Sequence, residues 1–395
     1  MRMGTEKAER EAVIVAAART PIGRAYKGSL AGERPDDLLA FALRTLLRQV
    51  PDLEPARIDE VIAGCGWPEQ QQGANVARRA ALLAGVPASV PAHTVSRFCA
   101  SSLQSIRSAF HAIAVGEGEV YVAAGVESLS QLDRGRRLES DCHPELSGGP
   151  GSRTDVYIPM GQTAENVVER FGVTREQMDR FAQRSQERAV AAQADGFFGR
   201  EITPYTTVEG LVIEADDGPR PSSTYEGLAA LKPSFREGGS VTAGNSCPFN
   251  DGAAAVLVTS RRVAAELGLT PRVRIRSAAV TALAPEIMGV GPIEAVRTAL
   301  RRAGITIDDV DVFELNEAFA AQVIPVCEAV GIDPFDDRFN PHGGAIALGH
   351  PFGMTGARIM GTLINGLEAA DGTFGLETMC VAGGQGMAMV VERTG

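Results

Sequence analysis

The apolar residues of the first 130 positions form short continuous runs that alternate with stripes of helical spacing. The runs are typical of buried strands and the stripes of amphipathic helices. The predicted strands are 12–18, 61–65 and 120–128, and the predicted helices are 36–50, 73–84 and one that follows residue 100. Strand–helix alternation of this kind predicts an α/β fold with a sheet covered by helices on both faces.

The second half of the chain repeats this order of elements. It contains a predicted strand at 273–280, a predicted helix at 293–303 and a predicted strand, tight turn and return strand over 376–393. The stretch 309–319 matches the second strand of the first half, because IDEV at 58–61 recurs as IDDV at 307–310. A glycine-rich turn at 343–360 feeds a further helix. This recurrence predicts an internal duplication.

The segment between the halves is predicted to be an insertion at 131–239. It starts as a polar, turn-rich stretch and continues as two helices, the second capped by Thr174 and Gln177. Residues 252–260 then read as a strand that returns to the first half. The predicted domains are therefore 11–130 plus 240–262, the inserted 131–239, and 263–395. Insertions of this size commonly carry substrate-binding surface.

Composition excludes several classes of protein. The chain has 395 residues, of which 44% are hydrophobic, and no apolar run reaches membrane-spanning length. Its start, MRMGTEKAERE, lacks the apolar core of a signal peptide, so we expect a cytoplasmic protein with no membrane partner. The net charge of −11 and the absence of a Lys/Arg-rich run argue against nucleic-acid binding.

The cysteines and histidines do not predict a metal site or a disulfide scaffold. The six cysteines form no CxxC pair, and the five histidines show no HxxxH spacing. Cys142 and His143 are adjacent, but they lie in a polar stretch where such a pair is usually incidental. GxGxxG after a strand and GxxxxGK[ST] are both missing, which excludes dinucleotide and P-loop sites.

Cys99, in VSRFCASS, lies where a predicted strand gives way to a helix. Free backbone N–H groups and the helix dipole at such a position favour negative charge, so we expect the pKa of this thiol to be lowered. A nucleophilic role competes with the ordinary alternative of a small buried apolar residue. The polar neighbours Ser96, Arg97 and Ser101 favour the nucleophile.

His350 lies between Gly349 and Pro351, which suit a rigid turn that holds an imidazole at a fixed angle. The alternative is a histidine satisfied by loop carbonyls. His342, eight residues earlier in NPHGG, is expected to line the same cavity behind His350.

Cys380 ends a predicted strand and precedes Ala382 and three glycines within four positions. Glycines there would let backbone amides approach a ligand as an oxyanion hole requires, although an ordinary hairpin uses the same turn. Asn316 ends another strand-like run and could hold a water or an oxyanion. Its neighbour Glu317 could be an ordinary surface acid.

At these residues the chain resembles the thiolase family from about residue 12 to the C-terminus. Five blocks resemble the family's signature blocks in their expected order: VSRFCASSLQS, VTAGNSCPFNDGAAAVL, ELNEAFAAQ, NPHGGAIALGHPFGMTGAR and MCVAGGQG. The resemblance implies a duplicated thiolase fold with five layers, α-β-α-β-α, and an inserted loop domain that binds coenzyme A. It also implies a homodimer or homotetramer, with coenzyme A as a substrate and no cofactor.

The resemblance also implies roles for individual residues. Cys99 would be the acyl-accepting nucleophile, His350 the base that activates it, and Cys380 the acid/base at the acetyl α-carbon. Asn316 would hold a water that forms one oxyanion hole with His350, and the backbone amides of Cys99 and Ala382 would form the other. The implied reaction is thiolytic cleavage of 3-ketoacyl-CoA or the reverse condensation of acetyl-CoA.

Substrate contacts are expected from a wider set of residues: Arg220, Met160, Ala243, Cys247, Phe319 and His342. The chain departs from the family where Ala382 replaces a glycine and where Cys247 and Pro248 replace a Ser-Gly pair. Pro159 before Met160 favours the broader-specificity, degradative branch, which includes fatty-acid β-oxidation. The alternatives are a ketosynthase-like condensing enzyme, which characteristically lacks the second thiol, and a non-catalytic acyl-CoA or lipid-carrier relative, which the loss of Cys99 or His350 would have favoured.

Overall fold

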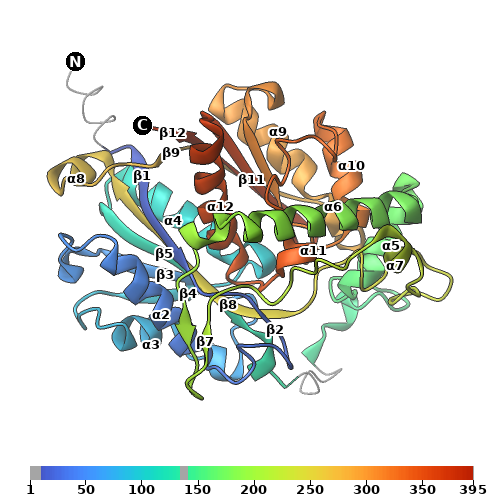
Figure 1. The fold of residues 1–395 in the computed structure, drawn as a ribbon, viewed down its shortest axis with the longest axis horizontal. Helices are drawn as coiled ribbons and strands as arrows, with labels where there is room; N and C mark the ends of the chain where they lie inside the picture. The colour runs from blue at the N-terminus through green and yellow to red at the C-terminus, as the bar shows by residue number, and fades with distance from the viewer. Residues whose placement is uncertain (1–9, 134–140, 395) are drawn as a thin grey trace.

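The computed structural model describes residues 10–133 and 141–394 (Figure 1). In the first half the strands are β1 (Ala12–Arg19), β2 (Gly23–Arg24), β3 (Glu60–Gly64), β4 (Ala92–Val95), β5 (Val120–Ser128) and β8 (Asn250–Ser260), and the helices are α2 (Pro35–Arg48), α3 (Val76–Leu83) and α4 (Ser101–Val115). In the second half the strands are β9 (Val273–Ala282), β10 (Val312–Leu315), β11 (Phe374–Val381) and β12 (Gln385–Arg393). The helices are α8 (Arg261–Glu266), which leads into this half, α9 (Pro292–Ala303), α10 (Ala320–Val330), α11 (Ala345–Leu348) and α12 (Thr355–Ala370). The α/β alternation predicted from the apolar pattern is confirmed.

Strand order reveals the duplication. The first half pairs its strands in the order β3–β5–β8–β1, and the second half in the order β10–β11–β12–β9. In each half the first pair is parallel and the next two pairs are antiparallel. The halves join in one ten-stranded sheet through two residue pairs between β1 and β9. The faint sequence repeat therefore corresponds to a repeated sheet topology.

Three apolar clusters separate the layers of the molecule. One packs α2 and α3 on the outer face of the first half, and another packs α9 and α10 on the outer face of the second half. The third lies between the halves, where α4 and α12 run side by side (Figure 1). Helices, the first half of the sheet, helices, the second half of the sheet and helices follow one another in this order, which is the predicted five-layer fold.

The segment between the halves carries helices α5 (Met160–Phe171), α6 (Arg175–Ala194) and α7 (Tyr225–Ala229). Thr174 and Gln177 form the predicted capping box at the start of α6. The segment is tied to the first half by Arg19, whose guanidinium binds Glu201 at 2.8 Å and Asp216 at 2.7 Å. Arg19 is 2% exposed, so these ion pairs are buried.

Some details differ from the sequence-based expectations. The helix predicted at 73–84 begins only at Val76, because Ala74 and Asn75 have positive φ and Asn75 caps the helix. Helix α10 contains Pro325 and was not predicted from the apolar pattern. The polar start of the insertion at 134–140 and most of the N-terminal stretch used to exclude a signal peptide lie outside the described residues.

The buried position of Arg19 predicts a large loss of stability when its charge is removed. Arg19→Met leaves Glu201 and Asp216 buried without their cation, so we expect the free energy of unfolding in urea to fall by about 3–5 kcal/mol. Arg34→Met is the control, because Arg34 pairs with Asp36 but its side chain is 53% exposed. It should change stability by less than about 1 kcal/mol. Equal stability of the two variants would contradict the structural role of Arg19.

Candidate active site

Cys99 lies in a tight turn directly before α4. A one-turn 3₁₀ segment, Phe98–Ala100, connects β4 to the helix, and Phe98 takes a positive φ of 42°. Ser101 closes this turn, since its hydroxyl accepts the Arg97 N–H at 2.9 Å and donates to the Phe98 carbonyl at 2.7 Å. The thiol is therefore placed at the strand-to-helix junction, as the sequence predicted.

Cys99 does not have the lowered pKa that its position suggested. Burial raises the pKa of the Cys99 thiol well above its usual range, and the nearby thiols of Cys380 and Cys247 raise it further. The backbone amides of Ala382 and of Cys99 itself bind the sulfur and act in the opposite direction. The prediction was wrong because the side chain is only 7% exposed, and loss of water outweighs the amide dipoles.

His350 is buried and its ring orientation is fixed. Its Nδ1 lies 2.7 Å from the Thr355 hydroxyl, which donates its only proton to the Pro351 carbonyl at 2.8 Å. The hydroxyl oxygen therefore accepts the proton of Nδ1–H, and Nε2 carries the lone pair. Burial, with a smaller contribution from Arg358, lowers the pKa of His350 to about 3. The ring is thus neutral at pH 7, and the lone pair of Nε2 makes it a base.

Asn316 faces this lone pair. Its amide nitrogen lies 3.2 Å from His350 Nε2, and its side-chain carbonyl oxygen is buried with no hydrogen-bond partner among the described residues. The backbone N–H of Asn316 binds the Thr378 carbonyl at 3.0 Å, which ties it to the strand that carries Cys380. The Asn316 side chain thus places an amide donor beside the His350 imidazole and keeps a carbonyl oxygen available as an acceptor. This arrangement fits a bound water or a substrate carbonyl oxygen.

Cys380 lies one residue before the end of β11 and has a hydrogen-bond donor that sequence reasoning missed. Gln322, on α10, donates from Nε2 to Cys380 Sγ at 2.9 Å. Burial raises the pKa of Cys380 to about 11, and this hydrogen bond opposes the rise. The signal in the sequence was a single polar residue within the apolar stretch AAQVIPV. A thiol with a donor that favours its charged form suits reversible proton transfer.

The turn after Cys380 has the backbone that an oxyanion hole needs. Gly383 and Gly384 both have φ of 80°, whereas Ala382 is not among the residues with positive φ. The alanine at this position is therefore compatible with the turn, and its amide reaches Cys99. A Cβ on Gly384 would lie 2.2 Å from the Leu283 carbonyl, so only glycine fits there.

Close backbone packing brings these turns together. A Cβ on Gly356, in the first turn of α12, would lie 2.4 Å from the backbone nitrogen of Leu103 in α4. The Gly353 carbonyl lies 1.9 Å from the position of a Cβ on Gly125 in β5. The starts of α4 and α12, which follow Cys99 and His350, therefore meet backbone to backbone.

Of the remaining residues predicted to contact the substrate, some pack near Cys380 and others are exposed. Cys247 is half-buried, and its backbone N–H binds the Ala318 carbonyl at 3.0 Å. Burial raises the pKa of the Cys247 thiol, and the nearby Cys380 thiol raises it further. Phe319 is buried beside the same segment and packs edge-on against Phe235, with ring centroids 5.8 Å apart. Met160 at the start of α5 packs against the apolar cluster that includes Cys380. Ala243 and Arg220 are exposed.

The surroundings of His342 and of Glu317 differ from those that the sequence suggested. His342 stacks on Phe197 at 3.5 Å and lies near Gly366, about 16 Å along α12 from Thr355, so it does not line the cavity of His350. It lines a separate cavity of about 490 Å³ with Arg188 and Arg200. Glu317 is a buried acid that accepts hydrogen bonds from Ser185, Asn340 and Ile346, not a surface acid.

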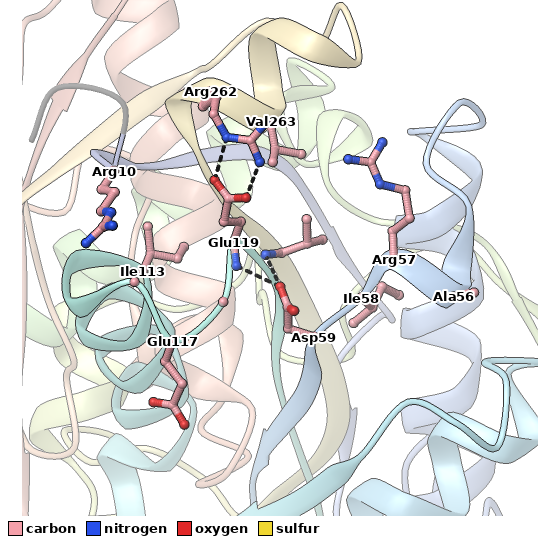
Figure 2. Close-up of a pocket in the computed structure, with 13 residues that line it drawn as sticks. Arg10, Ala56, Arg57, Ile58, Asp59, Ile113, Glu117, Glu119, Arg262 and Val263 are labelled. Atoms are coloured by element: carbon pink, nitrogen blue, oxygen red, sulfur yellow. Dashed lines mark hydrogen bonds and ion pairs between the residues drawn. The ribbon is translucent and has the colours of Figure 1, made fainter. Parts of the chain in front are cut away.

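A larger cavity of about 680 Å³ also lies apart from the site (Figure 2). Its walls include the C-terminal end of α4, whereas Cys99 precedes the N-terminal end about 22 Å away. Its charged side chains are largely satisfied, since Glu119 binds Arg262 and Asp59 accepts the N–H groups of Glu119 and Val120.

In residues 10–133 and 141–394 there is no cluster of His, Cys, Asp or Glu that could hold a metal ion.

The raised pKa of Cys99 predicts how iodoacetamide will react. Below that pKa the thiolate fraction grows with pH, so the alkylation rate of Cys99 should rise about tenfold per pH unit from pH 7 to 9. Peptide mapping should show Cys99 modified before Cys65 and Cys327, which are fully buried. A rate already constant from pH 6 upward would instead reveal a preformed thiolate.

Comparison with known proteins identifies the family. The model of the thiolase N-terminal domain matches residues 12–262, and that of the thiolase C-terminal domain matches residues 269–393. A 3-ketoacyl-CoA thiolase of Bacillus subtilis is 44% identical, with 97% of this chain and 99% of that protein covered. A beta-ketoadipyl-CoA thiolase of Pseudomonas aeruginosa is 45% identical, again with 97% and 99% covered. The crystal structure of the Bacillus anthracis acetyl-CoA acetyltransferase superimposes with a TM-score of 0.88 at 38% identity, covering 98% of this chain and 100% of that one. The chain belongs to the thiolase family.

Proposed function

We propose that this chain is an acyltransferase that cleaves 3-ketoacyl-CoA with coenzyme A, or runs the reverse Claisen condensation of acetyl-CoA, through an acyl group on Cys99. The observation that carries the proposal is the meeting of two turns at one sulfur, since the Ala382 amide binds Cys99 beside the Cys380 thiol. The names of the relatives support this reaction over a ketosynthase or a non-catalytic carrier.

In the first half-reaction Cys99 attacks the keto carbon of the substrate. Its proton passes to Nε2 of His350, which is neutral in the free protein. Because the pKa of the buried thiol is raised, proton transfer accompanies attack and no standing thiolate is required. The C2–C3 bond then breaks, and Cys380 protonates the acetyl-CoA carbanion equivalent that leaves. The acyl group stays on Cys99.

In the second half-reaction a coenzyme A thiol takes the acyl group from Cys99. The proton that His350 took from Cys99 first returns to the Cys380 thiolate, which restores both groups. His350 then accepts the proton of the incoming thiol and passes it to the Cys99 sulfur as the acyl group departs. Charge develops on a carbonyl oxygen in each half-reaction, so two sets of donors are needed. We assign one to the amides of Cys99 and Ala382, and the other to His350 with a water held by Asn316.

The substrate is expected to lie along a continuous surface from Cys247 to α5. Ser246 pairs with Phe319, Phe319 packs on Phe235, and Phe235 in turn lies against Gly161, next to Met160. With Ala243, these residues would contact the pantetheine arm, and the exposed Arg220 would reach the nucleotide end. On this basis we assign coenzyme A binding to the loop domain at 131–239, between the halves 11–130 plus 240–262 and 263–395.

Coenzyme A and acyl-CoA are the proposed partners, and no cofactor takes part in the proposed steps. None of the described helices is long and apolar enough to cross a bilayer. We propose a cytoplasmic homodimer or homotetramer acting in a degradative pathway such as fatty-acid β-oxidation. The open edge strand β4, with side chains that are partly exposed, supports self-association through the first half.

The central test is covalent labelling by radioactive acetyl-CoA. Wild-type protein should take up acetyl groups stoichiometrically, and Cys99→Ser should take up none. Cys142→Ser is the matched control, because Cys142 is half-buried in a surface segment, and it should label like wild type. A wild-type protein that binds acetyl-CoA without labelling would favour the carrier alternative and contradict the proposal.

Removal of the Cys380 thiol should separate acyl transfer to Cys99 from cleavage of the carbon–carbon bond. Cys380→Ser retains the nucleophile and its oxyanion amides, so acetyl labelling of Cys99 should persist. Thiolysis of acetoacetyl-CoA should fall by about 10²–10⁴-fold, because proton transfer at the α-carbon loses its acid/base group. Both rates can be followed by the thioester absorbance and by label retained on the protein. Unchanged thiolysis would remove Cys380 from its assigned role.

A further inference from the structure

One side chain connects the two turns that form the site. Arg97, two residues before Cys99, reaches across to the first residue of β12, and its Nη1 donates to Gln385 Oε1 at 2.6 Å. The two residues are 288 positions apart and belong to opposite halves of the duplicated fold. This bond therefore joins the nucleophile turn to the turn that carries the Ala382 amide.

The Cys99 side of this connection is a turn in an unfavourable backbone conformation. Phe98 has a φ of 42°, which bulky side chains rarely adopt, and its ring is 38% exposed, so burial does not account for it. Arg97 is held from both ends: its N–H binds Ser101 Oγ and its Nη1 binds Gln385. A strained turn persists only where its surroundings fix it, and such turns concentrate at functional sites.

The Cys380 side is rigid. Gln385 pairs with Val381 of β11 and with Ala282 of β9, so its backbone is fixed from two sides. The tight turn of Gly383 and Gly384 separates it from Ala382. Because Val381 and Gln385 pair with each other across this turn, the turn is anchored beside Gln385. A bond from Arg97 to the Gln385 side chain therefore holds Arg97 at a set position relative to the Ala382 amide.

The charge of Arg97 is unusual for a half-buried residue. None of the carboxylates that the structure describes forms an ion pair with it, and its partners are the amide oxygens of Gln385 and, at 3.1 Å from Nε, Gln104. Burial and the nearby Arg107 lower its pKa. Hydrogen bonds from a guanidinium are stronger than those between neutral groups, and its planar shape fixes their directions. Such a cation is suited to hold two neutral amides at a set separation.

We propose that Arg97 is a positioning residue for acyl transfer: through Gln385 it sets the separation between Cys99 and the Ala382 amide. This inference rests on the proposed function, in which that amide receives the developing negative charge. Loss of the bond lets the two turns move apart, which weakens the amide contact to sulfur and to oxyanion while leaving the coenzyme A surface intact.

The test compares Arg97→Met, Gln385→Leu and the double variant in thiolysis of acetoacetyl-CoA. Each single variant should lower kcat by about 10–100-fold, because a misplaced oxyanion donor costs less than an absent one, which typically costs about 10²–10³-fold. KM should change by less than about threefold, since uniform substrate binding is not affected. The double variant should be at most about twofold slower than the slower single variant, because both changes remove the same interaction.

Two further readouts distinguish positioning from general support. Alkylation of Cys99 by iodoacetamide at pH 8 should slow in Arg97→Met, because the Ala382 amide lowers the pKa of that thiol. Gln385→Glu, which keeps an acceptor for the guanidinium, should recover much of the rate that Gln385→Leu loses. Arg107→Met is the matched control, because Arg107 also contacts Gln104, at 3.4 Å, and forms no hydrogen bond with Gln385 in the described part of the chain. It should keep wild-type kcat.

The outcomes separate this inference from the proposed function. Unchanged kcat in Arg97→Met and Gln385→Leu, with wild-type turnover and acetyl labelling intact, would overturn the positioning role alone. Multiplicative losses in the double variant, or an equal loss in Arg107→Met, would also overturn it. A wild-type protein without labelling or turnover would overturn the proposed function first.

Discussion

The close approach of α4 and α12 is the constraint on which the rest of this structure depends. A side chain on Gly356 would run into the backbone of Leu103, and one on Gly125 would run into the Gly353 carbonyl. The two helices come from opposite halves of the duplicated fold. Helix α4 begins just after the turn that carries Cys99, and α12 begins just after the turn that carries His350. Their backbone contact therefore places Cys99 and His350 in the same region before any side-chain chemistry is considered.

Burial sets the protonation states in that region. It raises the pKa values of Cys99 and Cys380 and lowers that of His350, so the free protein holds neutral thiols beside a neutral imidazole. In the proposed reaction charge appears only as bonds form and break, and the amides of Cys99 and Ala382 and the side chains of Asn316 and Gln322 would stabilise it. Donors that are fixed in advance and shielded from water are more effective than mobile water at the same distance.

The same principle explains why so many fixed contacts surround the site. Thr355 and Pro351 determine the tautomer of His350, Gln322 binds Cys380, and Arg97 bridges to Gln385. Further away, the buried Arg19 ties the segment between the halves to β1 through Glu201 and Asp216. The contacts of Gln322, Arg97 and Arg19 join elements distant in the chain, so the geometry of the site depends on the assembly of both halves and the inserted segment.

The sequence by itself determined the α/β alternation, the internal duplication, and the turns that carry Cys99, His350 and Cys380. Apolar periodicity, glycine-rich turns and the five family blocks are local signals, and they need no knowledge of what lies across the molecule. Only the tertiary structure decided the sign of the pKa shift at Cys99, the separation of His342 from the site, the burial of Glu317, and the contacts of Gln322 and Arg97. Those properties depend on how much water each group loses and which distant atoms replace it, and neither quantity is set by neighbours along the chain.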